Sequence, residues 1–354
     1  MRPTARRALA AATFAAVLTL PGPASATTTP EPAHARPLAG LRVLLTNDDS
    51  MRAAKASHSD GLGLYELRRA LCAAGADVVV MAPWQVQSGK GTAVTNSGAL
   101  TLSRRTGLPA GYGDDCARTP SGSPVYGVCL AAGPCGPGSP SATPVDTVRL
   151  ALRGALAAKA GWSDGPDLVV TGINSGPNVS AQVNDSGTVG AALAAVEEGV
   201  PAVAFSTTGD DSGVNFPRAD YRATAGYAAR LVAGLRAHDL LTSRFALKVD
   251  YPDVSAGQSA KAARWTGVGH GQEVWHTYEP SGSDTFDIGY GFCEYRPGDA
   301  CTETVPDADA TALLRDGHIS VTPVTTDRTY GVRSTDRHRL NRVRTYVEHD
   351  GPRP

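Results

Sequence analysis

Short apolar runs alternate with longer amphipathic segments through most of the chain. Five runs are apolar at nearly every position, as is typical of strands covered on both faces of a sheet. They occupy residues 41–46, 77–82, 167–171, 202–206 and 245–249. Four segments between them have the apolar spacing of helices, at residues 62–74, 145–159, 188–198 and 221–237. This alternation predicts right-handed crossovers, and therefore a Rossmann-like, doubly wound and mostly parallel sheet of the α/β class.

Two stretches interrupt the alternation. Residues 104–144 are rich in Gly, Pro and Ser, and we interpret them as a loop-rich insertion. Residues 263–305 contain two tryptophans and many glycines, which favours a β-hairpin that protrudes from the main sheet. Helix and strand patterns resume at residues 307–322. We therefore expect one domain over residues 40–327, followed by a polar, Arg-rich C-terminal extension at residues 328–354.

The N-terminus has the layout of a secretory signal peptide. Three arginines within the first seven residues precede an apolar stretch from Ala8 to Leu20, and the small residues Ala24-Ser25-Ala26 form a cleavage site. The apolar stretch is too short to span a membrane. We expect residues 1–26 to be removed by cleavage after Ala26, residues 27–39 to be a disordered lead-in, and the protein to be secreted and not membrane-bound.

Six cysteines agree with an oxidising compartment, because an even number in a secreted chain favours disulfides. Cys293 and Cys301 flank the turn-forming sequence EYRPGDA, and we expect them to pair. We expect Cys116 to pair with Cys129 or Cys135, all three in loop-like sequence. Cys72 lies in a helical pattern and receives no partner.

Composition and missing motifs exclude several function classes. Hydrophobic residues make up 42% of the chain, enough for a substantial core, and the net charge is only −1. Because the sequence contains no long basic run, RNA-binding motif or zinc-finger spacing, we expect no nucleic-acid polymer as a partner. The absence of a GxSxG elbow argues against an α/β-hydrolase, and no GxGxxG or GxxxxGK[ST] loop follows a strand.

Oxygen-bearing residues follow three of the predicted strands. Asn47, Asp48 and Asp49 follow the first strand, Ser88 and Gly89 come after the second, and a segment from Asn174 to Asn178 follows the third. Ligands of open α/β sheets bind beyond the carboxyl ends of the strands. Two adjacent carboxylates there are best neutralised by a hard divalent cation such as Mg²⁺, Mn²⁺ or Ca²⁺. The alternative is that Asp48 caps the next helix and Asp49 is solvated.

A helix start follows the third strand. Ser186 fits an N-cap, and Gly187 and Thr188 open the helix. The free N–H groups of such an end bind anions, so its position one loop after Asn174 favours phosphate binding over an ordinary N-cap.

Several segments together resemble the SurE-like nucleotidases and acid phosphatases. They are LLTNDDS, QSGKGTAVT, DLVVTGINSGPNVSAQVNDSGTVGAAL and GHISVTPVTTD, in the family's order and spacing. The resemblance implies a Rossmann-like metallophosphatase that acts on 5′- and 3′-nucleotides, with exopolyphosphatase activity in some members. It also implies metal ligands at Asp48, Asp49, Ser88 and Asn174, and dimers or tetramers assembled through residues 263–305.

This chain departs from the family pattern at three places. Ser50 stands where the family usually has glycine, and Lys248-Val249-Asp250 replaces an Asn-Val-Asn run. Trp84 stands beside the serine loop in place of a charged family residue, and we interpret its indole as an exposed stacking face for a nucleotide base. These changes leave the expected metal ligands intact.

We therefore expect a metal-dependent phosphomonoesterase in which Asp48, Asp49 and Asn174 are catalytic and Asp48 accepts the proton of the attacking water. Asn47, Gly89, Asn178 and the helix start would contact phosphate or substrate. The alternatives are a broad acid phosphatase or exopolyphosphatase, a secreted nucleotide-binding or phosphate-binding protein without turnover, and an interaction module. The carboxylate pair favours an enzyme, since a binding protein has no need of it.

Overall fold

The computed structural model describes residues 36–52, 61–210, 214–293, 301–327 and 337–350. The predicted signal peptide and residues 27–35 of the lead-in lie outside these residues, so both stay predictions. The lead-in was predicted to extend too far, because residues 37–40 form a turn and Leu38 is buried in the core. Within the described part of the chain, no helix has both the length and the apolar character needed to cross a membrane.

The central feature is a sheet with nine strands among the described residues, in the order β3-β4-β2-β1-β5-β6-β7-β11-β8. The strands are β1 (Arg42–Thr46), β2 (Asp77–Pro83), β3 (Leu100–Arg104), β4 (Val125–Leu130), β5 (Leu168–Ser175), β6 (Ala202–Thr207), β7 (Ala246–Tyr251), β8 (Lys261–Trp265) and β11 (His318–Val324). Neighbours from β4 to β7 are parallel, whereas β3 and β11 pair antiparallel to β4 and β7. The predicted mostly parallel α/β fold is confirmed.

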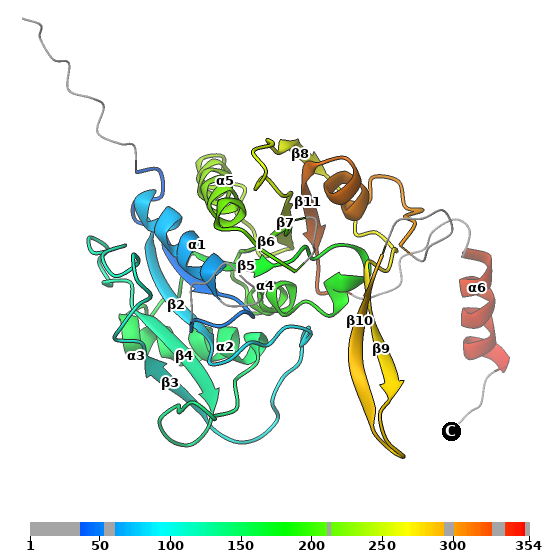
Figure 1. Ribbon diagram of the computed structural model, residues 1–354, viewed down its shortest axis with the longest axis horizontal. Helices are drawn as coiled ribbons and strands as arrows, with labels where there is room; N and C mark the ends of the chain where they lie inside the picture. Colours follow the sequence, from blue (N-terminus) through cyan, green and yellow to red (C-terminus); the bar gives the residue numbers. More distant parts are fainter. Residues whose placement is uncertain (1–35, 53–60, 211–213, 294–300, 328–336, 351–354) are drawn as a thin grey trace, which may run out of the picture. The chain divides into compact units, whose positions relative to one another are not determined.

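Helices cover both faces of this sheet, as a doubly wound fold requires (Figure 1). On one face, α1 (Leu62–Ala73) and α5 (Arg218–Ala237) bury Leu67, Leu71 and Val232 against the strands. On the other face, α2 (Pro144–Leu150) and α4 (Gly187–Glu197) bury Val148 and Val189. The helix expected at residues 145–159 is divided into α2, a π-helical turn (Ala151–Ala155) and α3 (Leu156–Ala160).

Residues 104–144 contain more regular structure than their composition predicted. The segment Val125–Leu130 forms β4, which is buried beside β2, and its Cys129 lies in a strand and not in a loop. This strand has only six residues, is preceded by Gly-, Pro- and Ser-rich sequence, and follows a strand (β3) and not a helix. For this reason the composition of residues 104–144 predicted a loop where β4 forms.

Three disulfides join the cysteines as Cys72–Cys116, Cys129–Cys135 and Cys293–Cys301, with Cα–Cα distances of 5.2, 5.8 and 5.9 Å. The predicted Cys293–Cys301 pair is confirmed. The pairing of Cys116 with Cys129 or Cys135 is wrong, because the loop that carries Cys116 packs against α1 and meets Cys72 there.

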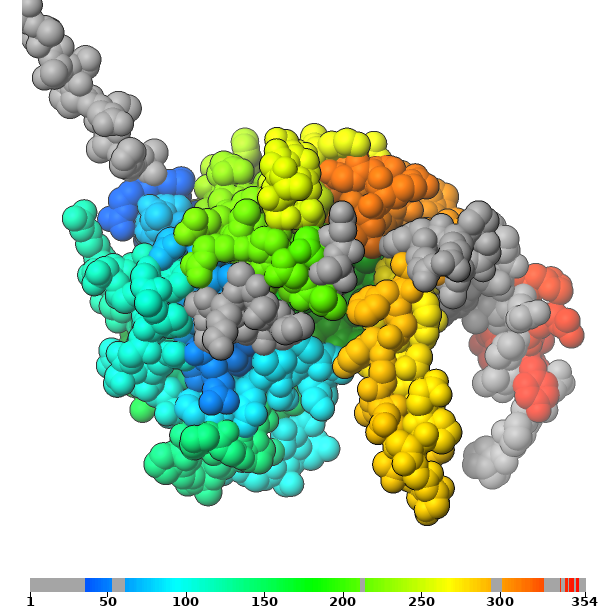
Figure 2. All heavy atoms as spheres, in the orientation of Figure 1, coloured from blue at the N-terminus to red at the C-terminus, as the bar shows by residue number. Residues whose placement is uncertain are grey.

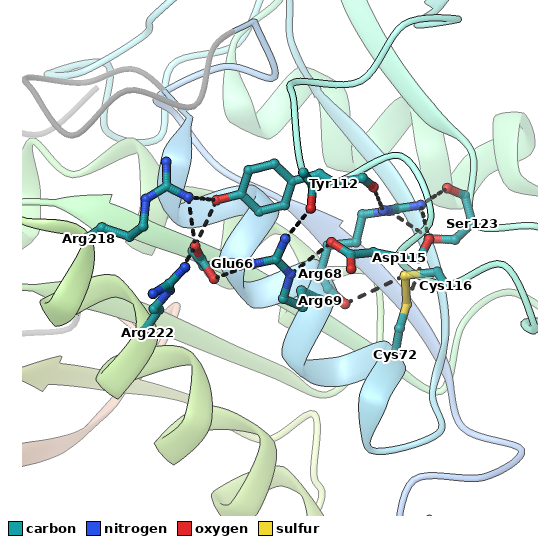
Figure 3. Close-up of polar contacts among 11 residues, drawn as sticks. Glu66, Arg68, Arg69, Cys72, Tyr112, Asp115, Cys116, Ser123, Arg218 and Arg222 are labelled. Carbon is teal, nitrogen blue, oxygen red and sulfur yellow. Dashed lines mark hydrogen bonds and ion pairs between the residues drawn. A yellow bond between two sulfur atoms is a disulfide. The ribbon is translucent and has the colours of Figure 1, made fainter.

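The same loop is fastened to the helices by a polar cluster (Figure 3). The buried Glu66 carboxylate accepts a hydrogen bond of 2.7 Å from the Tyr112 hydroxyl and forms ion pairs with Arg218 and Arg222 of α5 at 3.2 and 3.4 Å. Arg68, also buried, donates two hydrogen bonds of 3.0 Å to Ser123. The loop between β3 and β4 is therefore fixed to α1 both covalently and by charge.

The predicted hairpin consists of β9 (Val274–Pro280) and β10 (Phe286–Phe292), which form an antiparallel sheet apart from the main one. This segment projects from the surface as an extended arm (Figure 2). Tyr278, Ile288 and Tyr290 on it are each more than 60% exposed. The remaining elements are a 3-10 turn (Ser180–Asn184), π-helical turns at Thr311–Arg315 and Tyr346–Asp350, and α6 (Arg337–Thr345).

Candidate active site

The carboxyl ends of β1 and β5 bring two of the predicted ligands together. Asp49 follows β1 and is buried, and its Oδ2 accepts hydrogen bonds from the backbone N–H and the hydroxyl of Ser175, at 2.9 and 2.8 Å. The Ser175 hydroxyl also lies 2.7 Å from the hydroxyl of Tyr221 on α5. Since Ser175 directly follows Asn174, the contact holds Asp49 beside that amide.

Asp48 is held by the N-terminus of α4. Its Oδ1 accepts a hydrogen bond of 2.5 Å from the Thr188 hydroxyl, and a Cβ added at Gly187 would lie only 2.9 Å from Asp48 Oδ2. Burial raises the pKa of Asp48, while bonds from Thr188 and the backbone of Gly187 oppose that shift. Glycine at position 187 thus lets the carboxylate reach the positive end of the helix.

The predicted helix start is confirmed as an N-cap. Ser186 is the N-cap, and its hydroxyl accepts from the N–H of Val189 at 3.0 Å. Gly187 and Thr188 are buried and contact Asp48, so the end of α4 complements a carboxylate of the protein. The predicted contact of this helix start with phosphate stays a prediction.

Ser88 lies on a loop that is anchored at both ends of this site. The backbone N–H of Gln87 donates to the Asp48 carbonyl at 2.7 Å, and that of Gly91 donates to the Asp185 carbonyl at 2.9 Å. Ser88 and Gly89 between these anchors are exposed. The structure therefore brings the serine loop to Asp48 and leaves its tip accessible.

Asn174 lies at the carboxyl end of β5, and Asn178 lies in the loop that follows this strand. The Asn174 Nδ2 donates to the Gly176 carbonyl at 2.7 Å, which leaves its Oδ1 as the group suited to bind a cation. Asn178 Nδ2 donates to the Ser206 hydroxyl at 2.8 Å, and Ser206 is the register partner of Asn174. This bond holds the Asn178 amide against β6, beside the strand position of Asn174.

Asn47 holds the turn after β1. It is fully buried, and its Nδ2 donates to the Ser50 carbonyl at 3.1 Å. Ser50 has a φ of 68°, in the left-handed region that favours glycine. The next carbonyl, that of Met51, accepts from the Tyr65 hydroxyl and from Arg105. The predicted contact of Asn47 with substrate is replaced by a role in shaping the Asp48-Asp49 turn.

Trp84 is a packing residue and not the exposed stacking face that the sequence suggested. The indole is half-buried, packs over Gly127 and beside Met51, and donates its N–H to the Gly136 carbonyl at 2.7 Å. A Cβ at Gly127 would lie 2.6 Å from the ring. The indole therefore packs between β4 and the turn after β1.

The donor set fits a hard divalent cation. Asp48 and Asp49 contribute carboxylate oxygens, and Asn174 and Ser88 contribute an amide and a hydroxyl oxygen, the ligand types that Mg²⁺, Mn²⁺ and Ca²⁺ prefer. The Asp48 carboxylate accepts its hydrogen bonds from neutral groups, and the Oδ1 of buried Asn47 has no hydrogen-bond partner among the described residues. A cation would neutralise negative charge that these contacts leave in place.

A large cavity adjoins the ligand set. Its volume is about 1030 Å³, and its lining includes Asn174, Asp210, Phe216, Asp253, Val274 and Phe292. It lies between the ends of the central strands and the start of the β9–β10 hairpin. The cavity is far larger than a phosphate ion needs and has the size of sites for drug-sized ligands.

Sequence reasoning missed Ser175, Ser206 and Tyr221. Ser175 directly follows the predicted ligand Asn174, and Ser206 follows the apolar Phe205 at the end of a strand, signals that could have identified them. Tyr221 reaches the site from α5, 46 residues after Ser175, and no local pattern marks such a contact.

Fold and site together define a Rossmann-like α/β protein with an acidic, oxygen-rich site at the carboxyl ends of its parallel strands. Residues 43–274 match the family model for survival protein SurE, and the chain belongs to the SurE family.

Curated relatives and a solved structure agree with this assignment. The 5′-nucleotidase SurE of Solidesulfovibrio magneticus is 32% identical over 80% of this chain and 91% of its own length. That of Rubrobacter xylanophilus is 32% identical over 82% and 93%. The crystal structure of the Aquifex aeolicus SurE protein matches 87% of this chain and 99% of its own, with a TM-score of 0.57 and 26% identity.

Proposed function

We propose that this protein is a metal-dependent phosphomonoesterase that hydrolyses nucleoside 5′- and 3′-monophosphates to nucleoside and phosphate. The observation that carries the proposal is the buried Asp48–Asp49 pair beside Asn174, at the edge of a cavity. The relatives named 5′-nucleotidase support the 5′ activity. The 3′ activity and the metal requirement rest on the resemblance in sequence motifs and on the donor set.

The chain's own residues would hold and orient the reacting groups. Asp48, Asp49, Ser88 and Asn174 would bind the cation, which when bound polarises a phosphoryl oxygen. The second N–H of Asn178 and the backbone at Gly89 would hold the remaining phosphoryl oxygens as negative charge develops. Thr188 and Ser175 would keep the two carboxylates in place, since each donates to one of them.

The cavity supports a bulky leaving group. A nucleoside would extend from the ligand set toward Phe216 and Phe292, where aromatic rings offer apolar surface to a base or ribose. A phosphodiester should be a poor substrate, because the site is suited to a terminal phosphate.

The test is a panel of about a dozen phosphate esters with Mn²⁺ or Mg²⁺, with EDTA as the metal-free condition. We expect turnover of several nucleoside monophosphates and of p-nitrophenyl phosphate, none in EDTA, and a loss of roughly 100-fold or more in Asp48→Asn. Full activity in EDTA would refute the metal requirement. Faster turnover of polyphosphate or sugar phosphates than of every nucleotide would favour the broad phosphatase, and binding without turnover would favour a binding protein.

We further propose secretion and assembly of dimers or tetramers through the hairpin. The aromatic residues exposed on β9 and β10, among them Tyr278 and Tyr290, support the assembly. Light scattering of a Tyr278→Ser, Tyr290→Ser variant tests it, and an unchanged mass would contradict the hairpin interface. Detection of a mature N-terminus at Thr27 in culture medium would test secretion and cleavage.

A further inference from the structure

A buried ion triad lies next to the candidate site. Lys248 of β7 places its Nζ 2.5 Å from Asp250 Oδ2 and 3.0 Å from Asp309 Oδ2, and all three side chains are fully buried. Burial opposes the charge on Lys248, but Asp250 and Asp309 together raise its pKa above the ordinary value. The ammonium therefore stays charged between two carboxylates.

Stability alone does not explain why three charged side chains are buried here. Removing each ion from water costs several kcal/mol, and a well-packed apolar replacement is often as stable. The explanation must lie in what the two carboxylates hold.

Both carboxylates hold the loop that carries Asn178. Asp250 Oδ1 accepts the backbone N–H of Asn178 at 2.7 Å. Asp309 Oδ1 accepts the N–H groups of Ser180 and Gly269 at 3.1 and 3.0 Å. The Lys248 ammonium thus holds two carboxylates that bind the backbone of the loop at Asn178 and Ser180, and one of them also binds the backbone of Gly269.

The loop enters the site through Asn178. Its side chain bonds Ser206, which lies between Asn174 and Asp250 in the register of the parallel strands. A shift of Asp250 would move the Asn178 backbone, and with it the amide to which the proposed function assigns a phosphoryl oxygen. Lys248 is the only cation that forms an ion pair with Asp250 in the described part of the chain.

We propose that Lys248 is a positioning residue for phosphoryl transfer, which sets the place of the Asn178 amide through the Asp250 and Asp309 carboxylates. This role rests on the proposed phosphatase function. Lys248 touches neither the cation ligands nor the cavity lining, so its effect on turnover passes through Asn178.

The test is a double-mutant cycle in the full-length protein. Lys248→Met removes the ammonium and keeps an unbranched side chain, and Asn178→Ala removes the amide that it positions. We expect Lys248→Met to lower kcat by roughly 10- to 100-fold, as small displacements of a site group do. In the Asn178→Ala background it should lower kcat by less than about threefold, because coupled residues are not additive.

The matched control is Arg68→Met, which removes another buried cation. Arg68 lies on α1, bonds Ser123 and contacts no residue of the site, so its loss should leave kcat within about twofold of wild type. Equal losses from Lys248→Met in both backgrounds would overturn the proposal. A loss no larger than that of Arg68→Met would do the same.

Two further measurements keep the result decisive. If Lys248→Met does not fold, the variant Lys248→Asn, Asp250→Asn removes one charge of each sign, and the same cycle and criterion apply to it. The rise in unfolding temperature on addition of orthophosphate and Mn²⁺ measures phosphate binding without turnover. Lys248→Met should reduce that rise, and Arg68→Met should leave it unchanged. A wild type that binds phosphate but hydrolyses no ester would refute the phosphatase function, and the binding cycle would still decide the role of Lys248.

Discussion

Asp220 should make the stability of this protein depend on pH. The residue lies in the first turn of α5 and is fully buried, and its Oδ1 accepts the N–H of Val254 at 2.8 Å. Burial, with the nearby carboxylates of Asp253 and Asp210, raises the pKa of Asp220 from 3.8 to about 7. The folded protein therefore keeps a proton that the unfolded chain releases between about pH 4 and about pH 7.

Because the folded pKa is the higher one, this group's contribution is greatest below about pH 4 and is lost as the pH rises through about 7. At 1.36 kcal/mol per pKa unit, the total loss is at most about 4 kcal/mol, of which about 3 falls between pH 5 and pH 8. Asp220→Asn keeps the acceptor for Val254 and removes the titration.

Urea unfolding of wild type and Asp220→Asn at about pH 5 and about pH 8 measures this effect. As the pH rises from about 5 to about 8, the wild type should lose up to about 3 kcal/mol of unfolding free energy that Asp220→Asn retains. The exposed Asp164→Asn serves as control and should show no such gain. If the unfolding free energies of Asp220→Asn and wild type differ by the same amount at both pH values, the reasoning is refuted.

Three further substitutions test local features of the fold. Ser50→Gly should raise the free energy of unfolding by about 1 kcal/mol, since φ at Ser50 is 68°; a loss in urea unfolding would mean that the serine hydroxyl matters more than the backbone. Trp84→Ala should cost about 3–5 kcal/mol in the same assay and lower kcat/KM equally for nucleotides and p-nitrophenyl phosphate; a selective loss on nucleotides would restore the stacking role. Cys72→Ser with Cys116→Ser should cost about 4 kcal/mol, more than loss of the Cys129–Cys135 bond, because its loop spans 44 residues against 6; thermal unfolding that ranks the two pairs the other way would contradict this.

The central fold could be predicted because its signals are local. The strands β1, β2, β5, β6 and β7 are largely apolar runs, and helices with their own periodicity lie between β1 and β2, between β5 and β6, and between β6 and β7. β4 reaches β2 after an antiparallel turn from β3, so no helical pattern announces it. The partner of Cys116 was missed for a related reason, since its pairing depends on where a long loop packs.

The segments that meet at the candidate site could be predicted because strand ends and family motifs coincide there. The contacts of the individual side chains could not, because they depend on which way a side chain turns. Asn47, Thr188 and Trp84 all lie in the right segments, yet each is buried in contacts within the protein. Sequence identifies the segment that reaches a site, and packing decides which of its atoms remain accessible.

The end of α4 shows how this affects the chemistry. A free helix N-terminus after β5 would bind phosphate by its own N–H groups. Here Asp48 occupies that position, and Gly187 is needed for its approach. Hydrogen bonds from this helix end favour the ionised form of Asp48, the form that a cation would need as ligand. In the proposed function, Asn178 and the loop at Gly89 would supply donors to the phosphoryl oxygens. A buried carboxylate, that of Asp250, fixes the backbone of Asn178.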